Sequence, residues 1–538
     1  MKLKDYSFDD LPLSDLFKSY VSDYEDLAEF YSGNPYHMEL IREHAEKVSL
    51  KIDAQSTIEA LSEFNHQFDV DPAALDQIDR FSEENALAIV TGQQLGIYGG
   101  PLYTVYKSIT AIRLAALLEQ ELDMPVIPVF WLADEDHDFE EVKSVGILDR
   151  DDLLRISYER DAADTPPVSE IVLDDRFEQF RSQVEEQLQV TDFTDRLWTL
   201  LDRCYQEGAT FGEAFGKLMA ELFSKHGLVF AGSNFISIKR MGRDCLKAAV
   251  ENAEPLKEAL ENQSTKIGSQ FHQQAAVFDS NLFYLDEEAG RTKVYKNESN
   301  WHTDQGGEWS TEELLEDIEQ RPERFSPNVF LRPVFQDRIL PTLGYVGGPG
   351  EIAYYGQMKQ VYELYELQMP IVFPRMSGTI VEPAIDRILD ELPFELWEYG
   401  KRIEDLESEF VDRTEQVDIE SIFEDWKQQV EEISEAKANE IAEIDPTLEG
   451  AAGKATAVYS GELDKLKGKV YRSVKQQEQT QLNRIAKIKA QLFPERQMQE
   501  RSVSFIYYMN KYGLDIWDRL IEQLELEYAP DRHKLIYP

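Results

Sequence analysis

Two stretches of the sequence join a short apolar run to residues that could bind or transform a ligand. The first, residues 86–107, reads ALAIVTGQQLGIYGGPLYTVYK. A run of strand length ends there in a loop with four glycines, and a helix-like pattern follows. Glycine lets the backbone approach a ligand closely, and the N–H groups that open a helix attract anions. Because the loop matches neither of the two commonest phosphate-binding motifs, a plain structural turn stays open as the alternative.

The second stretch, residues 124–141, reads MPVIPVFWLADEDHDFEE. Its apolar run, residues 126–132, ends in six acidic residues and His137. Carboxylates around an imidazole raise its pKa, so His137, supported by Asp136 or Asp138, is a candidate for proton transfer. A divalent ion on Asp136 or Asp138 is a further option that the sequence leaves undecided. The alternatives are a solvated loop histidine and glutamates that only favour the positive end of a helix.

A third polar segment, residues 326–379, contains the glycine loop VGGPG and the motif PRMSGT. Glu351 follows the loop, where it could hold a substrate ammonium group or serve only as a first-turn helix acid. The guanidinium of Arg332 could donate two parallel hydrogen bonds to an anionic group of a ligand; the alternative is that it forms only a surface salt bridge. Arg375, at a strand end, could neutralise phosphate oxygens.

These segments supply the candidate site residues. The candidate catalytic residues are His137, Asp136, Asp138 and Glu351. The candidate residues for binding substrate or nucleotide are Thr91, Gly92, Gln93, Gln94, Gly96, Tyr103, Lys107, Asn328, Arg332, Gln336, Gly347, Gly348, Gly350, Tyr354, Arg375 and Ser377, and no metal ligand is assigned. Since ligands of open parallel sheets sit beyond the carboxyl ends of the strands, we expect all three segments to line one cleft above one sheet.

The elements that must position these residues form an α/β pattern. Strand-like and helix-like segments alternate over residues 81–262, which predicts a parallel sheet covered on both faces. The sheet pattern returns within residues 326–385, at 334–346 and 370–373. Between the two parts, residues 263–325 carry short alternating runs around a Glu-Ala-Gly turn and predict a β-rich insert. Two outer segments, residues 1–80 and 501–538, are expected to be helical.

Residues 386–500 have a long-helical texture. Apolar residues recur every three or four positions in two groups, separated by a predicted turn with Pro446, Gly450 and Gly453. Two antiparallel helices of this length extend further than a compact domain needs, so we expect a coiled coil that forms a homodimer. Packing of the arm against its parent domain is the alternative.

Composition narrows the class of partner. The chain has 55 basic and 103 acidic residues, a formal charge of −48, which disfavours binding to nucleic acid or anionic membranes. Its two cysteines form no C-x-x-C pair, and it lacks a signal-peptide pattern or a run of 18 apolar residues. We therefore expect a cytoplasmic protein without nucleic-acid or membrane partners. The acidity is also typical of adaptation to a salty cytoplasm.

Six motifs together resemble those of the bacillithiol biosynthesis cysteine-adding enzymes. In chain order they are TGQQLGIYGGPLYTVYK, FWLADEDHDFEEV, SPNVFLRPVFQD, YVGGPGEIAYYGQMK, PRMSGT and LFPERQMQER. The resemblance covers almost the whole chain. It implies a Rossmann-like core, akin to class I aminoacyl-tRNA synthetases, with connecting-peptide inserts and a dimerising coiled-coil arm. It also implies the last step of bacillithiol assembly, in which the carboxyl group of cysteine is joined to the amine of glucosaminyl-malate.

The resemblance leaves the chemistry of activation open. Amide formation from a free carboxylate needs an activated acyl group, so ATP or ADP is the expected cofactor, with Lys107 and Arg375 facing its anionic oxygens. The loop AGSNFISIKR, residues 231–240, lacks the Asp expected from relatives, and the synthetase signature motifs are absent. Two rival hypotheses remain: a ligase of the same fold that acts on another amine, and a dimeric scaffold with a vestigial nucleotide pocket.

Overall fold

The two apolar runs form adjacent parallel strands at the centre of the computed structural model. They are β2 (Leu87–Gln93) and β3 (Val126–Leu132), paired along their whole length. Nearly every residue of both strands is buried, as expected for strands with both faces covered. The structure describes residues 1–149, 152–160, 166–286, 289–297, 300–414, 418–526 and 528–538.

The central sheet is parallel throughout and has one reversal of strand order. The order is β13 (Ile371–Pro374), β12 (Thr342–Gly347), β2, β3 and β6 (Val229–Gly232). From β2 the chain adds strands on one side, and from β12 it adds β13 on the other. The crevice above β2 and β12 is therefore the switch point at which α/β sheets bind ligands.

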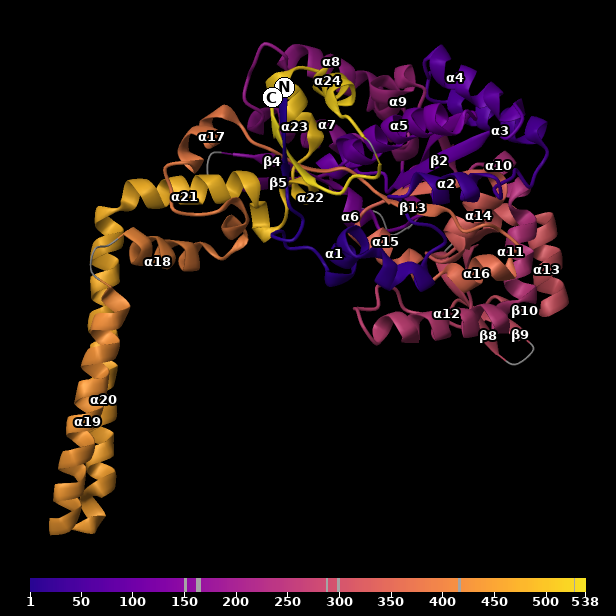
Figure 1. Ribbon diagram of the computed structural model, residues 1–538. Helices are drawn as coiled ribbons and strands as arrows, with labels where there is room; N and C mark the ends of the chain where they lie inside the picture. The colour runs from indigo at the N-terminus through magenta and orange to yellow at the C-terminus, as the bar shows by residue number, and fades with distance from the viewer. Residues whose placement is uncertain (150–151, 161–165, 287–288, 298–299, 415–417, 527) are drawn as a thin grey trace. The chain divides into compact units, whose positions relative to one another are not determined.

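Helices on the two faces complete the predicted α/β core (Figure 1). On one face α5 (Leu102–Leu122) packs Ala111, Leu114 and Leu118 against apolar side chains of β2 and β13. Around the sheet lie α3 (Ala54–His66), α4 (Pro72–Asp79), α9 (Phe211–Phe223) and α12 (Ala253–Gly268). Because α5 follows the glycine loop directly, packing of this helix fixes where that loop opens.

The predicted sheet pattern at residues 334–346 is only half right. Residues Leu331–Ile339 form a helix, α14, and the strand β12 starts at Thr342. Most of this helix is buried, the polar residues Gln336 and Asp337 included, so its apolar and polar positions do not separate into the two clear faces by which a helix is usually recognised.

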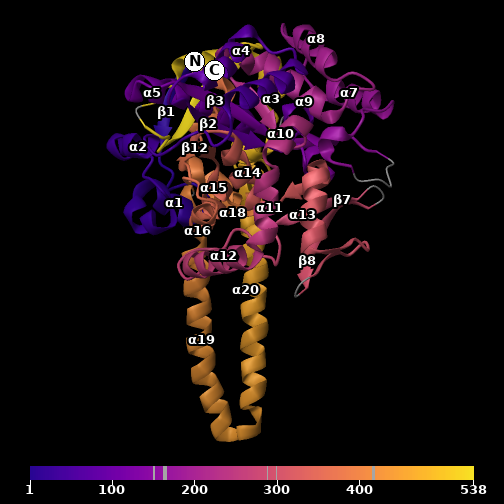
Figure 2. The ribbon, with the colours of Figure 1, turned by 90° about the vertical axis from the view of Figure 1, so that its right-hand side faces the viewer.

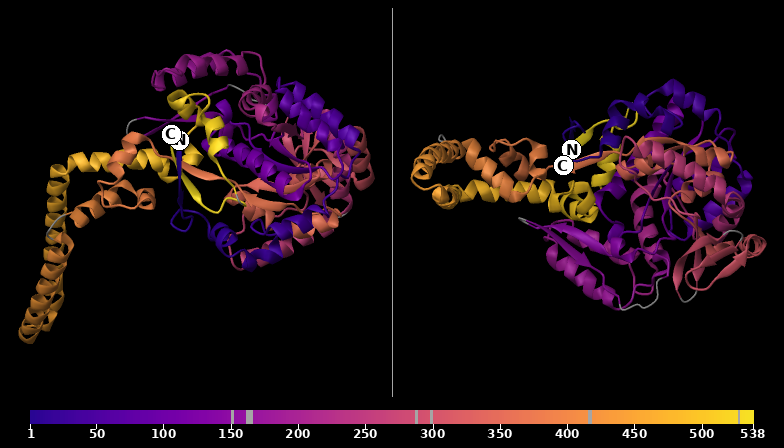
Figure 3. Two further views of the ribbon diagram at one scale, coloured as in Figure 1. Left: turned by 45° about the horizontal axis from the view of Figure 1, so that its top comes forward. Right: turned by 90° about the horizontal axis from the view of Figure 1, so that it is seen from below.

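The β-rich insert forms a sheet of its own, seen in the right-hand view of Figure 3. Its antiparallel strands are β10 (Glu308–Ser310), β9 (Asn300–Thr303), β8 (Gly290–Asn297), β7 (Leu282–Asp286) and β11 (Phe325–Pro327), in that order. The helix α13 (Thr311–Gln320) belongs to the same segment. A separate hairpin pairs β4 (Ser144–Leu148) with β5 (Leu153–Ser157).

Both outer segments contain strands as well as helices, which corrects the all-helical expectation. A three-stranded sheet joins β1 (Lys2–Tyr6), β15 (His533–Tyr537) and β14 (Ser377–Ile380). The two ends of the chain lie side by side because β1 pairs with β15 (Figures 1 and 3). The helices of these segments include α1 (Asp15–Ser22), α2 (Met38–Ala45), α22 (Gln499–Ser502), α23 (Phe505–Tyr512) and α24 (Ile516–Gln523).

Contacts divide the chain into two units. The core unit comprises residues 1–149, 153–380 and 499–538, and residues 381–498 make up nearly all of the arm unit. The arm contains α17 (Pro383–Leu389), α18 (Ile403–Thr414), α19 (Ile419–Ile444), α20 (Glu449–Gln477) and α21 (Gln479–Leu492).

The helices α19 and α20 run antiparallel side by side, as Figure 2 shows. Phe423 and Leu463 are buried between them, and Lys427 pairs with Asp464 at 2.6 Å. The turn between the two helices is Pro446–Leu448. It contains Pro446, as predicted, but Gly450 and Gly453 lie inside α20. These contacts join the two helices of one chain, and the homodimer stays a prediction. Among the described residues, no helix has the length and apolar character needed to cross a bilayer.

The glycine loop can be tested for its structural role. Gly99 has φ +82°, and a Cβ there would lie 2.2 Å from Cζ of Phe505 in α23. We expect Gly99→Ala to lower the free energy of unfolding by roughly 3 kcal/mol, from left-handed strain plus overpacking. Gly208→Ala is the matched control, because Gly208 has φ +86° with open space around it. Urea unfolding measures both, and equal losses would show that Phe505 does not constrain the loop.

Candidate functional site

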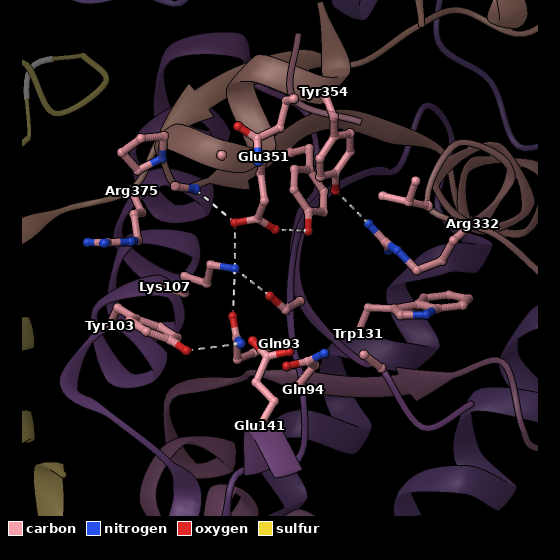
Figure 4. Close-up of a pocket in the computed structure, with 18 of the residues that line it drawn as sticks. Gln93, Gln94, Tyr103, Lys107, Trp131, Glu141, Arg332, Glu351, Tyr354 and Arg375 are labelled. Atoms are coloured by element: carbon pink, nitrogen blue, oxygen red, sulfur yellow. Dashed lines mark hydrogen bonds and ion pairs between the residues drawn. The ribbon is translucent and has the colours of Figure 1, made fainter. Parts of the chain in front are cut away.

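A cavity of about 550 Å³ opens at the switch point of the central sheet (Figure 4). We call it the first cavity. Much of its lining comes from the end of β2 and the loop after it, the start of α5, β12 with the loop after it, and the end of β13. The end of β3 and residues 141, 274, 329, 332 and 501 complete it. The lining residues are Gly92, Gln93, Gln94, Tyr103, Lys107, Trp131, Ala133, Glu141, Gln274, Val329, Arg332, Tyr345, Gly348, Pro349, Gly350, Glu351, Tyr354, Arg375 and Arg501.

A buried ion pair forms one wall of the first cavity. Nζ of Lys107, in α5, lies 2.6 Å from Oε2 of Glu351, in α15 (Pro349–Tyr355). The same ammonium donates to the carbonyl of Gly92 at 2.7 Å and to Oε1 of Gln93 at 2.9 Å. All three of its protons are therefore used within the protein.

The carboxylate of Glu351 is held equally firmly. It accepts hydrogen bonds from the Tyr345 hydroxyl at 2.6 Å and from the Gly348 N–H at 2.8 Å. Burial raises the pKa of Glu351, but the Lys107 ammonium and these two donors together hold it below its usual value. Lys107 is thus no free phosphate donor, and Glu351 caps its own helix, as the structural alternative from the sequence had it.

Arg375 lines the same cavity and is also paired. Its Nη2 donates to Oε1 of Glu500 at 2.6 Å, and its Nη1 donates to the carbonyl of Met376 at 2.7 Å. Glu500 further accepts from the Ser377 hydroxyl, 2.9 Å away, and Ser377 contacts Nδ1 of His533 at 2.8 Å. Ser377 therefore supports Arg375 from behind and does not line the cavity.

Arg332 differs from Lys107 and Arg375 in having no carboxylate partner among the described residues. Its guanidinium donates to Oε1 of Gln336 at 3.2 Å and to the Tyr354 hydroxyl at 3.1 Å. Among the described residues it has no ion pair with a carboxylate. Gln336 is fully buried and only supports the arginine, whereas Tyr354 lines the cavity.

A second cavity of about 340 Å³ adjoins the first, and the two share Ala133, Val329 and Arg332. It lies between the ends of β3 and β6 and the strands of the insert. Its other lining residues are Glu135, Asp136, Ser233, Phe278, Ser280, Leu282, Phe283, Arg291, Lys293, Pro327 and Asn328. Asn328 also caps α14, since its Oδ1 accepts from the N–H groups of Phe330 and Leu331.

The acidic segment divides its roles. Asp136 lines the second cavity, and its Oδ2 accepts from Nε2 of Gln94 at 2.5 Å, which links it to the first cavity. Asp138 caps the short helix α6 (Phe139–Val142) by accepting from the Glu141 N–H at 3.1 Å. The described part of the chain contains no group of three or more His, Cys, Asp or Glu side chains that could hold a metal ion.

The predicted rise in the pKa of His137 is wrong. Burial, followed by the nearby Arg291 guanidinium, lowers it to about 4. Nδ1 of His137 lies 2.9 Å from the Glu135 carbonyl, and among the described residues its buried Nε2 has no partner. The imidazole lines neither cavity. The neighbouring carboxylates that motivated the prediction are less influential than desolvation.

Several other candidates lie behind the cavities. Thr91 donates its hydroxyl to the carbonyl of Val346 at 2.9 Å and so joins β2 to β12. Gly96 and Gly347 are also absent from both linings. Sequence reasoning missed Arg501 and Gln274 as lining residues; the LFPERQMQER motif contains Arg501, whereas nothing in the sequence singles out Gln274.

The fold and the site define a Rossmann-like α/β protein with its ligand cavity at the topological switch point. The chain belongs to the bacillithiol biosynthesis BshC family. A family model described as the N-terminal Rossmann-like domain of bacillithiol biosynthesis BshC matches residues 1–376, and one described as its C-terminal coiled-coil domain matches residues 378–537. Both the resemblance and the fold class predicted from the sequence are confirmed.

Similar proteins cover nearly the full length. A protein of Salinibacter ruber named "Putative cysteine ligase BshC" is 32% identical over 520 residues, 95% of this chain and 94% of its own. Proteins of the same name from Chlorobaculum tepidum and Geobacillus kaustophilus are 31% and 30% identical. The match to the Chlorobaculum protein covers 90% of this chain and 88% of that protein, and the match to the Geobacillus protein covers 90% of each.

The buried pair makes a strong prediction for stability. Removing one partner leaves a buried charge without compensation, so Lys107→Met and Glu351→Gln should each lower the free energy of unfolding by about 3–5 kcal/mol. The double variant should lose clearly less than the sum of the two, because neither charge is then stranded. Denaturant titration measures the cycle, and additive losses would show that the two groups are not coupled.

The same pair sets part of the acid stability. The pKa of Glu351 is lowered in the folded state, so its contribution is fully present above its ordinary pKa of 4.5. That contribution is lost as the pH falls through the lower folded value. In Lys107→Met the ammonium that lowers the folded pKa is gone while burial still raises it, so the loss of stability on acidification that comes from Glu351 should be smaller than in the wild type, or reversed. Thermal melts between pH 3 and 7 test this, and superimposable profiles would contradict it.

Proposed function

We propose that this protein is a ligase that joins the carboxyl group of cysteine to the amine of glucosaminyl-malate, the last step of bacillithiol biosynthesis. The observation that carries the proposal is the lining of the first cavity. Its residues come mostly from the segments TGQQLGIYGGPLYTVYK, YVGGPGEIAYYGQMK and PRMSGT, in a chain that belongs to the BshC family throughout. The similar proteins are named as cysteine ligases, which supports the cysteine part of the proposal.

In the proposed reaction the amine nitrogen forms a bond to the carbonyl carbon of cysteine. The bond from that carbon to one activated carboxyl oxygen breaks, and the nitrogen loses a proton. A nucleoside triphosphate supplies the activation, by making that oxygen part of a phosphate leaving group. The exposed Arg501 fits its anionic oxygens better than Lys107 or Arg375, because each of those two is already paired with a carboxylate.

Arg332 is the group best placed to stabilise the reacting carbonyl. It lies where the two cavities meet and carries no carboxylate partner among the described residues. Donors fixed in advance at the position where negative charge develops are worth several kcal/mol in acyl transfer. Hydrogen bonds to the side chains of Gln336 and Tyr354 fix the plane of the guanidinium group.

Two carboxylates fit the remaining polar roles. Glu141, exposed at the mouth of the first cavity, has no ion pair in the described structure and suits the cysteine ammonium better than the fully engaged Glu351. Asp136 suits the proton of the attacking amine, since it lines the second cavity and contacts Gln94 of the first. We assign that role to Asp136 in preference to His137.

One assay tests the function. Purified full-length protein is incubated with cysteine and glucosaminyl-malate, with or without ATP, and the products are identified by mass spectrometry. We expect bacillithiol only when ATP is present. Consumption of ATP with a different amine alone would identify the rival ligase, and no turnover with any amine would favour the scaffold.

The choice of proton acceptor can be tested in the same assay. Asp136→Asn should lower kcat by roughly 10²- to 10⁴-fold, the usual contribution of general base catalysis. His137→Ala and Asp138→Asn are the controls and should lose far less, because neither side chain lines a cavity. Circular dichroism melts confirm folding of all three. A larger loss for His137→Ala than for Asp136→Asn would return the role to the histidine.

A further inference from the structure

The second cavity has its own basic wall, supplied by the β-rich insert. Arg291 and Lys293 alternate along β8 and so project from the same face of the strand. Each covers an aromatic ring: the guanidinium carbon of Arg291 is 3.9 Å from the centre of Phe283, and Nζ of Lys293 is 3.1 Å from that of Phe278. Contact with these rings positions both charged groups at the cavity wall.

Neither cation has a carboxylate partner in the described structure. Arg291 donates from Nε to the Ser326 hydroxyl at 2.9 Å and from Nη2 to the Pro327 carbonyl at 2.8 Å. These two bonds hold the guanidinium plane and neutralise none of its charge. Nζ of Lys293 lies over the ring of Phe278, at 3.1 Å, and near that of Tyr295, at 5.2 Å, while the carboxylates of Asp279 and Asp304 act on it only from beyond ion-pair distance.

The cations with and without a carboxylate partner differ in burial. Acidic residues outnumber basic ones by 103 to 55, and each lysine or arginine that is fully buried in the described structure has a carboxylate partner: Lys107 has Glu351, Arg375 has Glu500, and Lys239 has Glu135. Arg332, Arg291 and Lys293 are partly exposed and have none. Partly desolvated charge is costly unless it is compensated. Arg332, Arg291 and Lys293 gather in the two joined cavities without a carboxylate at ion-pair distance among the described residues, and the exposed Arg501 adds a further positive charge to the first cavity. This arrangement points to a ligand that brings negative charge.

The opposite wall carries acid. Glu135 is already used, by Lys239 and by the Ser233 hydroxyl at 2.5 Å. Asp136 accepts from Gln94 and from the His137 N–H at 2.7 Å, and its carboxylate has no ion pair among the described residues. The second cavity is therefore polarised, with cations on the insert and a carboxylate toward the first cavity. A molecule with an anionic end and an amine end matches this arrangement.

We propose that the second cavity binds the malyl end of the amine acceptor, with its two carboxylates against Arg291 and Lys293. The sugar then extends past Asp136, so that its amine reaches the junction at Arg332. The inference rests on the proposed function and deepens it, because it assigns the acceptor to the insert side of the core. The aromatic faces of Phe278 and Phe283 flank the bound carboxylates and exclude water from them.

The test compares two acceptors that share the amine and differ in the carboxylates: glucosaminyl-malate and methyl glucosaminide. We expect Arg291→Met and Lys293→Met each to lower kcat/KM for glucosaminyl-malate by about 10- to 100-fold. The value for methyl glucosaminide and the KM for cysteine should stay the same. Lys296→Met is the matched control on β8, since Lys296 lies outside the cavity and pairs with Glu254 at 3.0 Å. Arg291→Lys keeps the charge and should recover part of the loss.

Equal losses for both acceptors would overturn the proposal, as would a raised KM for ATP instead of the acceptor, which would assign the cations to phosphate. A binding experiment separates this proposal from the proposed function. In calorimetric titration of the full-length protein with glucosaminyl-malate alone, the Arg291→Met, Lys293→Met double variant should lose binding while Lys296→Met keeps it. If the wild type forms no bacillithiol yet shows this pattern, the function fails and the site stands. If the wild type forms bacillithiol and the double variant matches Lys296→Met, the site fails and the function stands.

Discussion

The pairing of Lys107 with Glu351 is the constraint on which the candidate site depends. One partner comes from the helix after β2 and the other from the helix after β12, so the pair bridges the switch point of the sheet. It ties two glycine loops that are about 250 residues apart in sequence to one wall. Lys107 is buried, Glu351 is partly exposed, and both are engaged in several hydrogen bonds, which gives that wall a fixed shape with little net charge.

A second ion pair extends the same principle to a later part of the chain. Glu500 returns to the core after the arm and holds Arg375 at the end of β13, together with Ser377 and the N–H of Gly378. Two of the three internal cations near the first cavity are thus neutralised by the protein. The third, Arg332, has no carboxylate partner among the described residues and bonds only to Gln336 and Tyr354, which is why the proposed reaction assigns it the reacting carbonyl.

Local sequence patterns predicted the frame of this structure well. The runs before Gly92 and Ala133 were recognisable as strands because they are short, apolar and followed by polar loops. The helix over Leu331–Ile339 and the strand β15 were not, because burial on all sides removes periodicity and because pairing with β1 and β14 is a long-range event. Residue types near strand ends identified Arg332, Glu351 and Arg375, but not which of them is already bonded. The pKa of His137 was mispredicted since neighbouring charges are visible in a sequence and burial is not.

The arm unit is inserted in sequence between Ile380 and Gln499, two positions that the core itself joins by hydrogen bonds between Ile380 and the Gln499 side chain. During synthesis the ribosome must therefore translate residues 381–498 before the carboxylate that neutralises Arg375 exists. Until residues 499–538 emerge, the nascent core has an uncompensated internal arginine and lacks β15 between β1 and β14. The cavity can therefore be completed only when the segment that follows the arm in sequence has been synthesised.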